Sequence, residues 1–164
     1  LHWMEPAATH SEVLRILRPG GVLGAFAYAM PPTVSPELEK AFTRVLHTSN
    51  KLIKERHLYE DVRAWPLPEQ LAYMKGNDLY GYAKEIWLHQ AIHGTATDFV
   101  GLAKTYGSID RGLKAGISES DLGITTMQEI AARTIGDEQR SWTFSYRMIV
   151  GVKYLRPLRY VPDT

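Results

Sequence analysis

Apolar residues near the start of the chain recur at the spacing of one helix face and are followed by a continuous apolar run. Pro6 suits the first turn of a helix, where its missing N–H is not needed, and the periodic positions reach Leu17. The Pro-Gly-Gly sequence at residues 19–21 ends that helix and turns the chain. Residues 22–28 are uniformly apolar, which is typical of a strand covered on both faces. The pattern therefore predicts a helix, a tight turn and a buried strand.

A second helix is predicted after the apolar run. The Met-Pro-Pro sequence at residues 30–32 should end the strand, because proline cannot donate to a sheet ladder. Ser35 followed by Pro36 is typical of a helix start, where a serine side chain caps the first turn. Apolar residues then recur at helical spacing from Leu38 to Ile53, so this helix should reach the early fifties.

The pattern weakens between residues 55 and 93 and becomes regular again toward the end of the chain. Alternation at residues 79–88 indicates a strand, and a helix is expected to open at residues 97–98 (Thr-Asp). Residues 125–126 (Thr-Thr) should cap a further helix. Apolar and polar residues alternate at residues 142–152, which is the clearest strand pattern in the chain.

Composition narrows the class of protein. With 45% hydrophobic and 23% charged residues over 164 positions, the chain suits a globular domain and not a disordered or coiled-coil protein. A formal net charge of +1 with scattered cations gives no footprint for nucleic acid. No apolar stretch reaches the roughly 18 residues that cross a bilayer, and the start lacks a signal-peptide pattern, so no membrane partner is expected. The absence of cysteine excludes a thiolate nucleophile and fits a reducing cytoplasm.

Four segments together resemble one known family. They are His-Trp-Met-Glu at residues 2–5, Leu-Arg-Pro-Gly-Gly at 17–21, the stretch 99–111 with Thr-Tyr-Gly-Ser inside it, and the strand at 142–153. In this order they are similar to segments of class I S-adenosylmethionine-dependent methyltransferases that act on small molecules. The Pro-Gly-Gly turn alone is common among α/β proteins, whereas the ordered set is specific and spans nearly the whole chain.

The resemblance implies an α/β fold: a partial Rossmann-like methyltransferase sheet made of the last strands, with helices and an inserted helical cap. Residues 1–164 would form one truncated domain, in which residues 1–29 are a helix–turn–strand core. Residues 30–95 would hold the cap over the substrate, and residues 96–164 the closing helices and an antiparallel strand. The resemblance also implies a small-molecule substrate and S-adenosylmethionine as the cofactor.

The cofactor-binding part of the family pattern has no counterpart in this sequence. In the family, a glycine-rich loop after the first strand and an acidic residue ending the second strand hold the cofactor. Here the Gly20-Gly21 pair precedes a strand instead of following one, so cofactor binding by this chain alone is doubtful. Because residue 1 is Leu and not Met, we expect a processed or trimmed start, or a longer parent chain.

The missing half has a consequence for association. In the family, the strand at residues 22–28 pairs with a fourth strand, and without it a long, uncharged, apolar edge would be open to another chain. We therefore expect a cover for this edge: a homodimer, a partner polypeptide that supplies the missing half, or a rearranged helix.

The resemblance gives His2 and Trp3 a place in the cleft where methyl transfer occurs. His2 would act as a general base, because an imidazole titrates near pH 6.5; the alternative is a solvated terminal residue, with Trp3 packed in the core. Tyr28 ends the strand at residues 22–28, where open α/β sheets bind ligands. It would donate a hydrogen bond to a substrate oxygen, or simply pack.

Tyr106 and Ser108 would line a substrate pocket, or Ser108 would only cap the next helix. The expected cap is also rich in aromatic residues, which would either line a pocket or pack as core. These aromatic residues are Trp65, Tyr73, Tyr80, Tyr82 and Trp87. Trp65 is the substrate-binding candidate among them.

Two other kinds of site are weighed against the sequence. Glu85, His89 and His93 would share one face of a helix as a divalent-metal site, but Gly94 ends any helix there and a strand would not group them. No metal site is therefore expected. A serine hydrolase is not expected either, because no Gly-x-Ser-x-Gly turn is present.

Three functions remain open. The first is the substrate-side portion of a small-molecule methyltransferase, active when the cofactor half is supplied. The second is a shortened methyltransferase-like protein that binds a small hydrophobic molecule or guides a cofactor-free rearrangement or cyclisation. The third is a non-catalytic interaction subunit that uses its open sheet edge as the docking surface.

Overall fold

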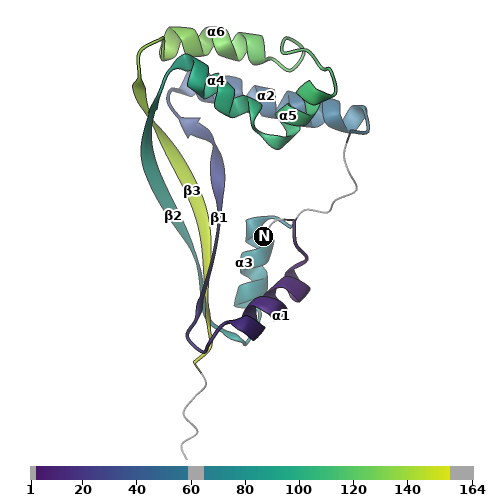
Figure 1. Cartoon of the computed structure of the whole chain (residues 1–164), viewed down its shortest axis with the longest axis vertical. Coiled ribbons are helices and arrows are strands. Elements are labelled where there is room, and N and C mark those ends of the chain that lie inside the picture. Colours follow the sequence, from purple (N-terminus) through teal and green to yellow (C-terminus); the bar gives the residue numbers. More distant parts are fainter. Residues whose placement is uncertain (1–2, 59–64, 156–164) are drawn as a thin grey trace, which may run out of the picture. The chain divides into compact units, whose positions relative to one another are not determined.

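The computed structural model describes residues 3–58 and 65–155, in which the chain forms six helices and three strands (Figure 1). The helices are α1 (Pro6–Ile16), α2 (Pro36–Glu55), α3 (Leu67–Lys75), α4 (Ala96–Lys104), α5 (Gly107–Lys114) and α6 (Ile124–Thr134). The strands are β1 (Val22–Thr33), β2 (Tyr80–Gly94) and β3 (Arg140–Lys153). This is a mixed α/β protein, as predicted.

The three strands form one antiparallel sheet in the order β1-β3-β2, with β3 between its two neighbours (Figure 1). Its register is visible at the end of β3. Lys153 exchanges backbone hydrogen bonds with the turn before β1, donating to Gly21 at 2.8 Å and accepting from Gly20 at 3.0 Å. The backbone N–H of Tyr154 donates to the carbonyl of Leu79, just before β2, at 2.8 Å. β1 and β2 are therefore both edge strands.

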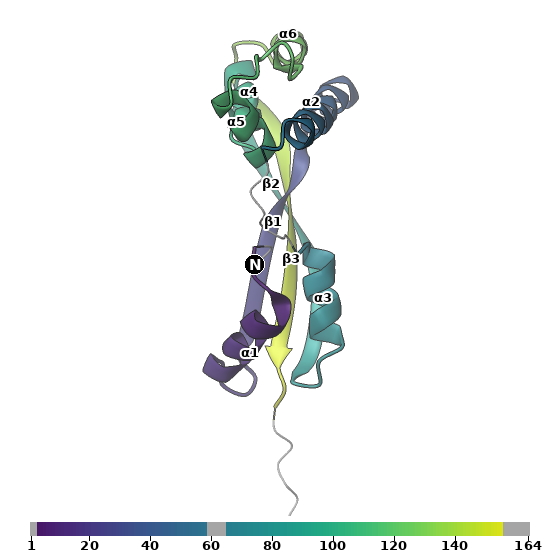
Figure 2. The same cartoon turned by 90° about the vertical axis from the view of Figure 1, so that its right-hand side faces the viewer.

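The chain divides into two compact units, and each strand contributes a segment to both. The first unit is Leu1–Ala27, Val62–Leu88 and Tyr146–Thr164, and the second is Tyr28–Asp61 and His89–Ser145. Within the first unit, α1 and α3 pack against one another (Figure 2). Its core consists of Leu14, Ala25, Leu67, Met74, Tyr80 and Ile149.

Both ends of α1 are satisfied by side chains. The Glu5 carboxylate caps its start by accepting two backbone N–H groups of the first turn, at 3.0 and 2.7 Å. The Lys153 ammonium group donates to the carbonyls of Leu14 and Leu17 at the other end, at 2.5 and 2.8 Å. This helix is thereby tied to the end of β3.

In the second unit, α2, α4, α5 and α6 gather around an apolar core (Figure 2). Phe99 is its centre: its ring lies 5.7 Å from that of Phe42 on α2 and 4.9 Å from that of Trp142 on β3, measured between centroids. α4 begins with a capping box in which Thr95 and Asp98 satisfy each other's backbone N–H groups. Large buried side chains and a firm helix start fix this unit.

Several predicted elements are confirmed. β1 begins at Val22, α2 has Ser35 as its N-cap and ends at Glu55, and strands occupy the two predicted regions before Gly94 and after Arg140. The Met-Pro-Pro break is wrong, because β1 continues to Thr33. This is allowed on an edge strand, where a missing N–H can face away from the ladder.

The prediction of a strand covered on both faces is also wrong. Val22, Phe26 and Tyr28 of β1 are 58%, 65% and 60% exposed. Two helix caps differ as well. α4 is capped by Thr95, two residues earlier than expected, and α6 by Gly123, whose φ of 79° provides the turn without a side-chain hydrogen bond.

The expected helical cap at residues 30–95 is helical only in part. It contains α2 and α3, but residues 80–94 near its end form the strand β2. The weak alternation at residues 79–88 predicted the first part of this strand. The residues that follow are mostly polar and show no alternation, so the rest of the strand was not predicted. The final part of the expected cap is thus an edge strand of the sheet.

The buried positions of β3 change parity along the strand. Trp142 and Phe144 are buried in the second unit, whereas Ile149 and Gly151 are buried in the first. Since side chains alternate between faces, the even-numbered residues of the first-unit segment lie on the face opposite α1 and α3. The sequence pattern did not show this change, because apolar residues occupy both parities from Met148 onward.

That face of the first unit, here called the open face, is apolar. The rings of Phe26 and Tyr146 lie across from each other, 6.5 Å apart between centroids, and the Met148 sulfur lies beside Gly24. On β2, both Tyr80 and Ala83 pack in the core, so the alternation between faces holds only from Tyr82 onward, where the even-numbered side chains lie on the open face. The open face therefore comprises Val22, Phe26, Tyr82, Ile86, Leu88, Tyr146 and Met148, and the described helices of the first unit leave it uncovered.

A substitution at Gly151 should test the packing of the first unit. A methyl group there would lie 2.8 Å from the Tyr80 ring and 3.1 Å from the Met74 sulfur. Gly151→Ala is therefore expected to lower the free energy of unfolding by about 1–3 kcal/mol. Gly101→Ala is the matched control: nothing lies within 4 Å of its added carbon on α4, so it should stabilise by about 0.5–1 kcal/mol. Urea denaturation measures both, and equal effects would contradict the packing.

Candidate functional site

The predicted substrate-side residues of the first unit do not form a recognisable site in the described part of the chain. His2, the predicted base, lies outside the described residues. Trp3 is 60% exposed, so it is not a core residue, and Trp65 is half-buried just before α3. Their role as substrate contacts stays a prediction.

Tyr28, Tyr106 and Ser108 belong to the second unit. Tyr28 is exposed and packs edge-on against Phe144, with ring centroids 5.6 Å apart. Tyr106 is the N-cap residue of α5, and Ser108 lies inside that helix, so the interpretation of Ser108 as its cap is wrong. The Ser108 hydroxyl instead shares a hydrogen bond of 2.9 Å with the hydroxyl of Ser49, a buried residue of α2. This bond ties α5 to α2.

Glu85, His89 and His93 all lie on β2, at every fourth position of the strand. The strand does not bring them together, as the sequence indicated, because neighbours in this series are about 13 Å apart along it. Glu85 instead accepts from Trp87 and Arg147, and His89 shares a 2.9 Å hydrogen bond with Ser145. Among the described residues, no group of three acidic, histidine or cysteine side chains is placed to hold a metal ion.

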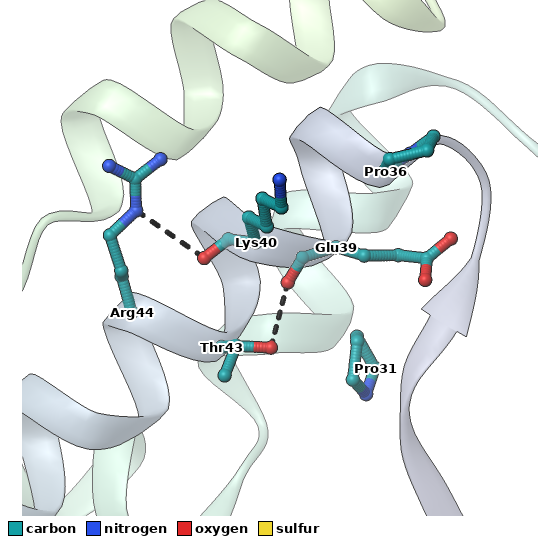
Figure 3. A pocket seen from close by; sticks show the side chains of 6 residues that line it. All are labelled: Pro31, Pro36, Glu39, Lys40, Thr43 and Arg44. Carbon is teal, nitrogen blue, oxygen red and sulfur yellow. Dashed lines mark hydrogen bonds between the residues drawn. The ribbon is translucent and has the colours of Figure 1, made fainter.

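A surface hollow of about 720 Å³ lies where the end of β1 meets the first turns of α2 (Figure 3). We call it the α2 hollow. Its lining residues are Pro31, Pro36, Glu39, Lys40, Thr43 and Arg44. The prolines supply rigid apolar walls, since their ring fixes φ. The four helical residues supply two cations, one carboxylate and one hydroxyl.

Hydrogen bonds hold several of these side chains in place. Glu39 accepts from the backbone N–H of Val34 at 3.2 Å, and the Thr43 hydroxyl donates to the carbonyl of Glu39 at 2.8 Å. Arg44 donates through Nε to the carbonyl of Lys40 at 3.4 Å. In the described part of the chain, neither Lys40 nor Arg44 has an acidic partner within 4.0 Å. The hollow therefore presents positive charge that the surrounding residues leave unpaired.

The most strongly perturbed titratable groups lie elsewhere, in a buried cluster of the first unit that we call the His10 network. Its members are His10 on α1, Tyr73 and Gln70 on α3, and Tyr80 at the start of β2. His10 and Gln70 are fully buried. The Tyr73 ring stacks on the imidazole, with centroids 4.9 Å apart and planes 18° apart.

The bonds of this network define one protonation state. Nε2 of His10 lies 2.9 Å from the amide oxygen of Gln70, which can only accept, so Nε2 carries the proton. Nδ1 therefore accepts from the Tyr80 hydroxyl at 2.7 Å, and the Gln70 amide nitrogen donates to the carbonyl of Met4 at 3.3 Å. The chain of donors runs in one direction, from Tyr80 through His10 and Gln70 to Met4.

Burial dominates the electrostatics of the network. It lowers the pKa of His10, and the hydrogen bond that His10 donates to Gln70 and the charge of Glu5 oppose that shift only in part. Burial, together with the neighbouring Tyr73, raises the pKa of Tyr80 to about 12. Both side chains are thus neutral near pH 7. The network stabilises the packing of α1, α3 and β2, and its central groups have no access to a substrate.

The sequence analysis predicted neither the His10 network nor the α2 hollow. His10 lies between Pro6 and Leu14, four residues from each, and all three are buried. That spacing places His10 on the apolar face of α1, so the signal was present. Gln70 and the pairing with Tyr80 carry no such signal, because they meet only through the tertiary fold. The unpaired state of Lys40 and Arg44 likewise depends on where distant acidic residues lie.

Comparison with known proteins assigns no family: no protein-family model matches the chain, and neither does any curated protein. Among the described helices, none combines the length and the apolar character needed to cross a bilayer.

The His10 network should make stability depend on pH. The unfolded chain takes up a proton on this imidazole near pH 6.5, whereas the folded chain resists it. The contribution of neutral His10 to the free energy of unfolding is therefore complete above pH 6.5. It is lost progressively as the pH falls from there to the lowered pKa of His10 in the folded chain. Urea denaturation at about pH 7.5 and pH 5.5 should show the loss.

Two substitutions separate this effect from other titrations. His10→Leu should lower the free energy of unfolding by about 1–3 kcal/mol near neutral pH, because it leaves the buried polar groups of Tyr80 and Gln70 unpaired. It should also reduce the difference in this free energy between about pH 7.5 and pH 5.5. His47→Gln, at an exposed position of α2, is the control and should change neither. An unchanged pH profile in the His10 variant would contradict the assignment.

Proposed function

We propose that this chain is the substrate-side portion of a methyltransferase that transfers a methyl group from S-adenosylmethionine to a small molecule. The ordered sequence motifs are the first support. The observation that carries the proposal is that β1 is an edge strand whose exposed face continues into the open face. An unpaired edge beside an apolar sheet face is what remains when the neighbouring part of a larger sheet is supplied separately.

A single kind of cover satisfies both features. A strand paired with β1 would use its free backbone groups, and helices packed on the open face would remove Phe26 and its neighbours from water at about 25 cal/mol per Å². We propose that this cover holds the cofactor. A second copy of the chain, a partner polypeptide or further residues of the same protein would each provide it.

The chemistry requires little from the substrate side. Methyl transfer depends mainly on holding the acceptor atom in line with the sulfonium, with a base where the acceptor carries a proton. We assign the role of base to His2 by resemblance. Trp3, Tyr28, Trp65, Tyr106 and Ser108 are the proposed substrate contacts. For Ser108, the bond to Ser49 fixes the position of its hydroxyl and leaves it able to accept.

A second candidate function is favoured by the α2 hollow. Its rigid proline walls and unpaired cations are present without any contribution from a cofactor half. A cofactor-free protein that binds a small molecule there would retain this hollow and use no S-adenosylmethionine. The two functions differ in whether the cofactor binds.

Calorimetric titration with S-adenosylmethionine and S-adenosylhomocysteine distinguishes them. Both the 164-residue chain and the complete product of its gene should be titrated. Binding at micromolar strength to either is expected. Phe26→Lys should abolish it, because a charge on the open face prevents the cover from packing.

Ile16→Lys is the matched control, since Ile16 is equally exposed, at 62% against 65%, but lies on α1. It should leave cofactor binding unchanged. A well-folded protein that binds neither compound in either form would overturn the methyltransferase proposal and leave the cofactor-free function.

A further inference from the structure

The α2 hollow contains an electrostatic feature that the fold does not explain. Lys40 and Arg44 are four residues apart on α2 and therefore lie on the same side of the helix. Like charges at this spacing destabilise a helix by about 0.2–0.5 kcal/mol. The pair therefore opposes helix formation unless something outside the helix neutralises it.

The acidic residues of α2 are engaged elsewhere. Glu37 accepts from Arg133 on α6 at 2.6 Å, and Glu55 lies 3.8 Å from Lys51. Glu39 lines the hollow itself, but its carboxylate accepts the backbone N–H of Val34. Lys51 of α2 thus has an acidic partner in the described structure, whereas the two cations in the hollow do not.

The hydrogen bonds within the hollow leave donors of Lys40 and Arg44 and the acceptor of Thr43 available to a ligand. Arg44 uses only Nε toward the carbonyl of Lys40, which leaves the terminal nitrogens of its guanidinium group with their donors. In Figure 3 the Lys40 ammonium group makes no hydrogen bond to the other residues drawn. Thr43 donates to a backbone carbonyl, so its oxygen remains an acceptor. The Arg44 guanidinium group lies on the side of Lys40 away from Pro31 and Pro36, so the donors and the proline rings line different parts of the hollow (Figure 3).

We propose that the α2 hollow binds an organic carboxylate with a flat apolar body. The prolines would contact the body, and Lys40 and Arg44 would pair with the carboxylate. With two cations and one carboxylate, the lining carries a net charge of +1, which a monoanion neutralises, whereas a phosphate dianion would leave the occupied site with excess negative charge. This site is separate from the substrate contacts proposed for methyl transfer, and the binding itself needs no cofactor.

The test uses three probes that share one ring system: 2-naphthoate, its neutral amide 2-naphthamide, and the dianion 2-naphthyl phosphate. Each is titrated into the full ¹⁵N-labelled chain while backbone amide shifts are followed. The expected result is that naphthoate shifts the amides of Glu39, Lys40, Thr43 and Arg44 and binds at least about fivefold more tightly than naphthamide. Naphthyl phosphate should bind more weakly than naphthoate.

Variants on α2 identify the side chains that give the preference for naphthoate over naphthamide. Lys40→Gln and Arg44→Gln should each reduce the preference for naphthoate over naphthamide to less than about twofold. Lys51→Gln is the matched control, because it removes an exposed cation of α2 that already has a partner, and it should leave the preference unchanged. Exposed charges of this kind are tolerated, so all three variants should fold.

Three results would overturn the inference: equal binding of the acid and the amide, shifts confined to residues outside the hollow, or an equal effect of Lys51→Gln. Tighter binding of the phosphate would overturn the assignment to a monocarboxylate. None of these results depends on S-adenosylmethionine, so failure here is distinguishable from failure of the methyltransferase proposal.

Discussion

The pairing of β3 along both of its edges is the constraint on which the rest of the structure depends. β1 and β2 come earlier in the chain and are not neighbours in the sheet, so neither has its observed partner until the last strand is present. Such long-range pairing is costly in chain entropy and must be repaid by packing. β3 supplies that packing twice, through Trp142 in the second unit and Ile149 in the first. Its last residue also closes the turn before β1 and holds the end of α1.

The two units use different means to fix their helices. The second unit relies on large apolar side chains around Phe99 and on a capping box at the start of α4. The first unit has fewer buried apolar residues and places a paired imidazole among them. A buried polar group stabilises only when all of its hydrogen bonds are made, and here each bond fixes the direction of the next, from Tyr80 through His10 to Gln70. Specific contacts thus take the place of apolar area.

The open face and the α2 hollow are two surfaces that favour different partners. The open face exposes apolar side chains that favour a large packed partner, because burial of apolar area is the dominant gain in association. In the described part of the chain, Lys40 and Arg44 of the α2 hollow form no ion pair, which favours a small anion. The first surface supports the proposed missing half, and the second supports a ligand. The functional proposals rest on this contrast.

Periodicity along the chain was sufficient to predict the start of β1, the full length of α2 and the presence of β2 and β3, because alternation and helical spacing are local properties. Ser35 as a cap was predictable for the same reason. Tertiary structure alone decided that β1 runs through its prolines as an edge strand and that the buried face of β3 changes parity. It also decided that Ser108 bonds Ser49 instead of capping α5, and that His10 meets Gln70 and Tyr80. Each of these depends on which distant residues become neighbours, and local pattern carries no information about that.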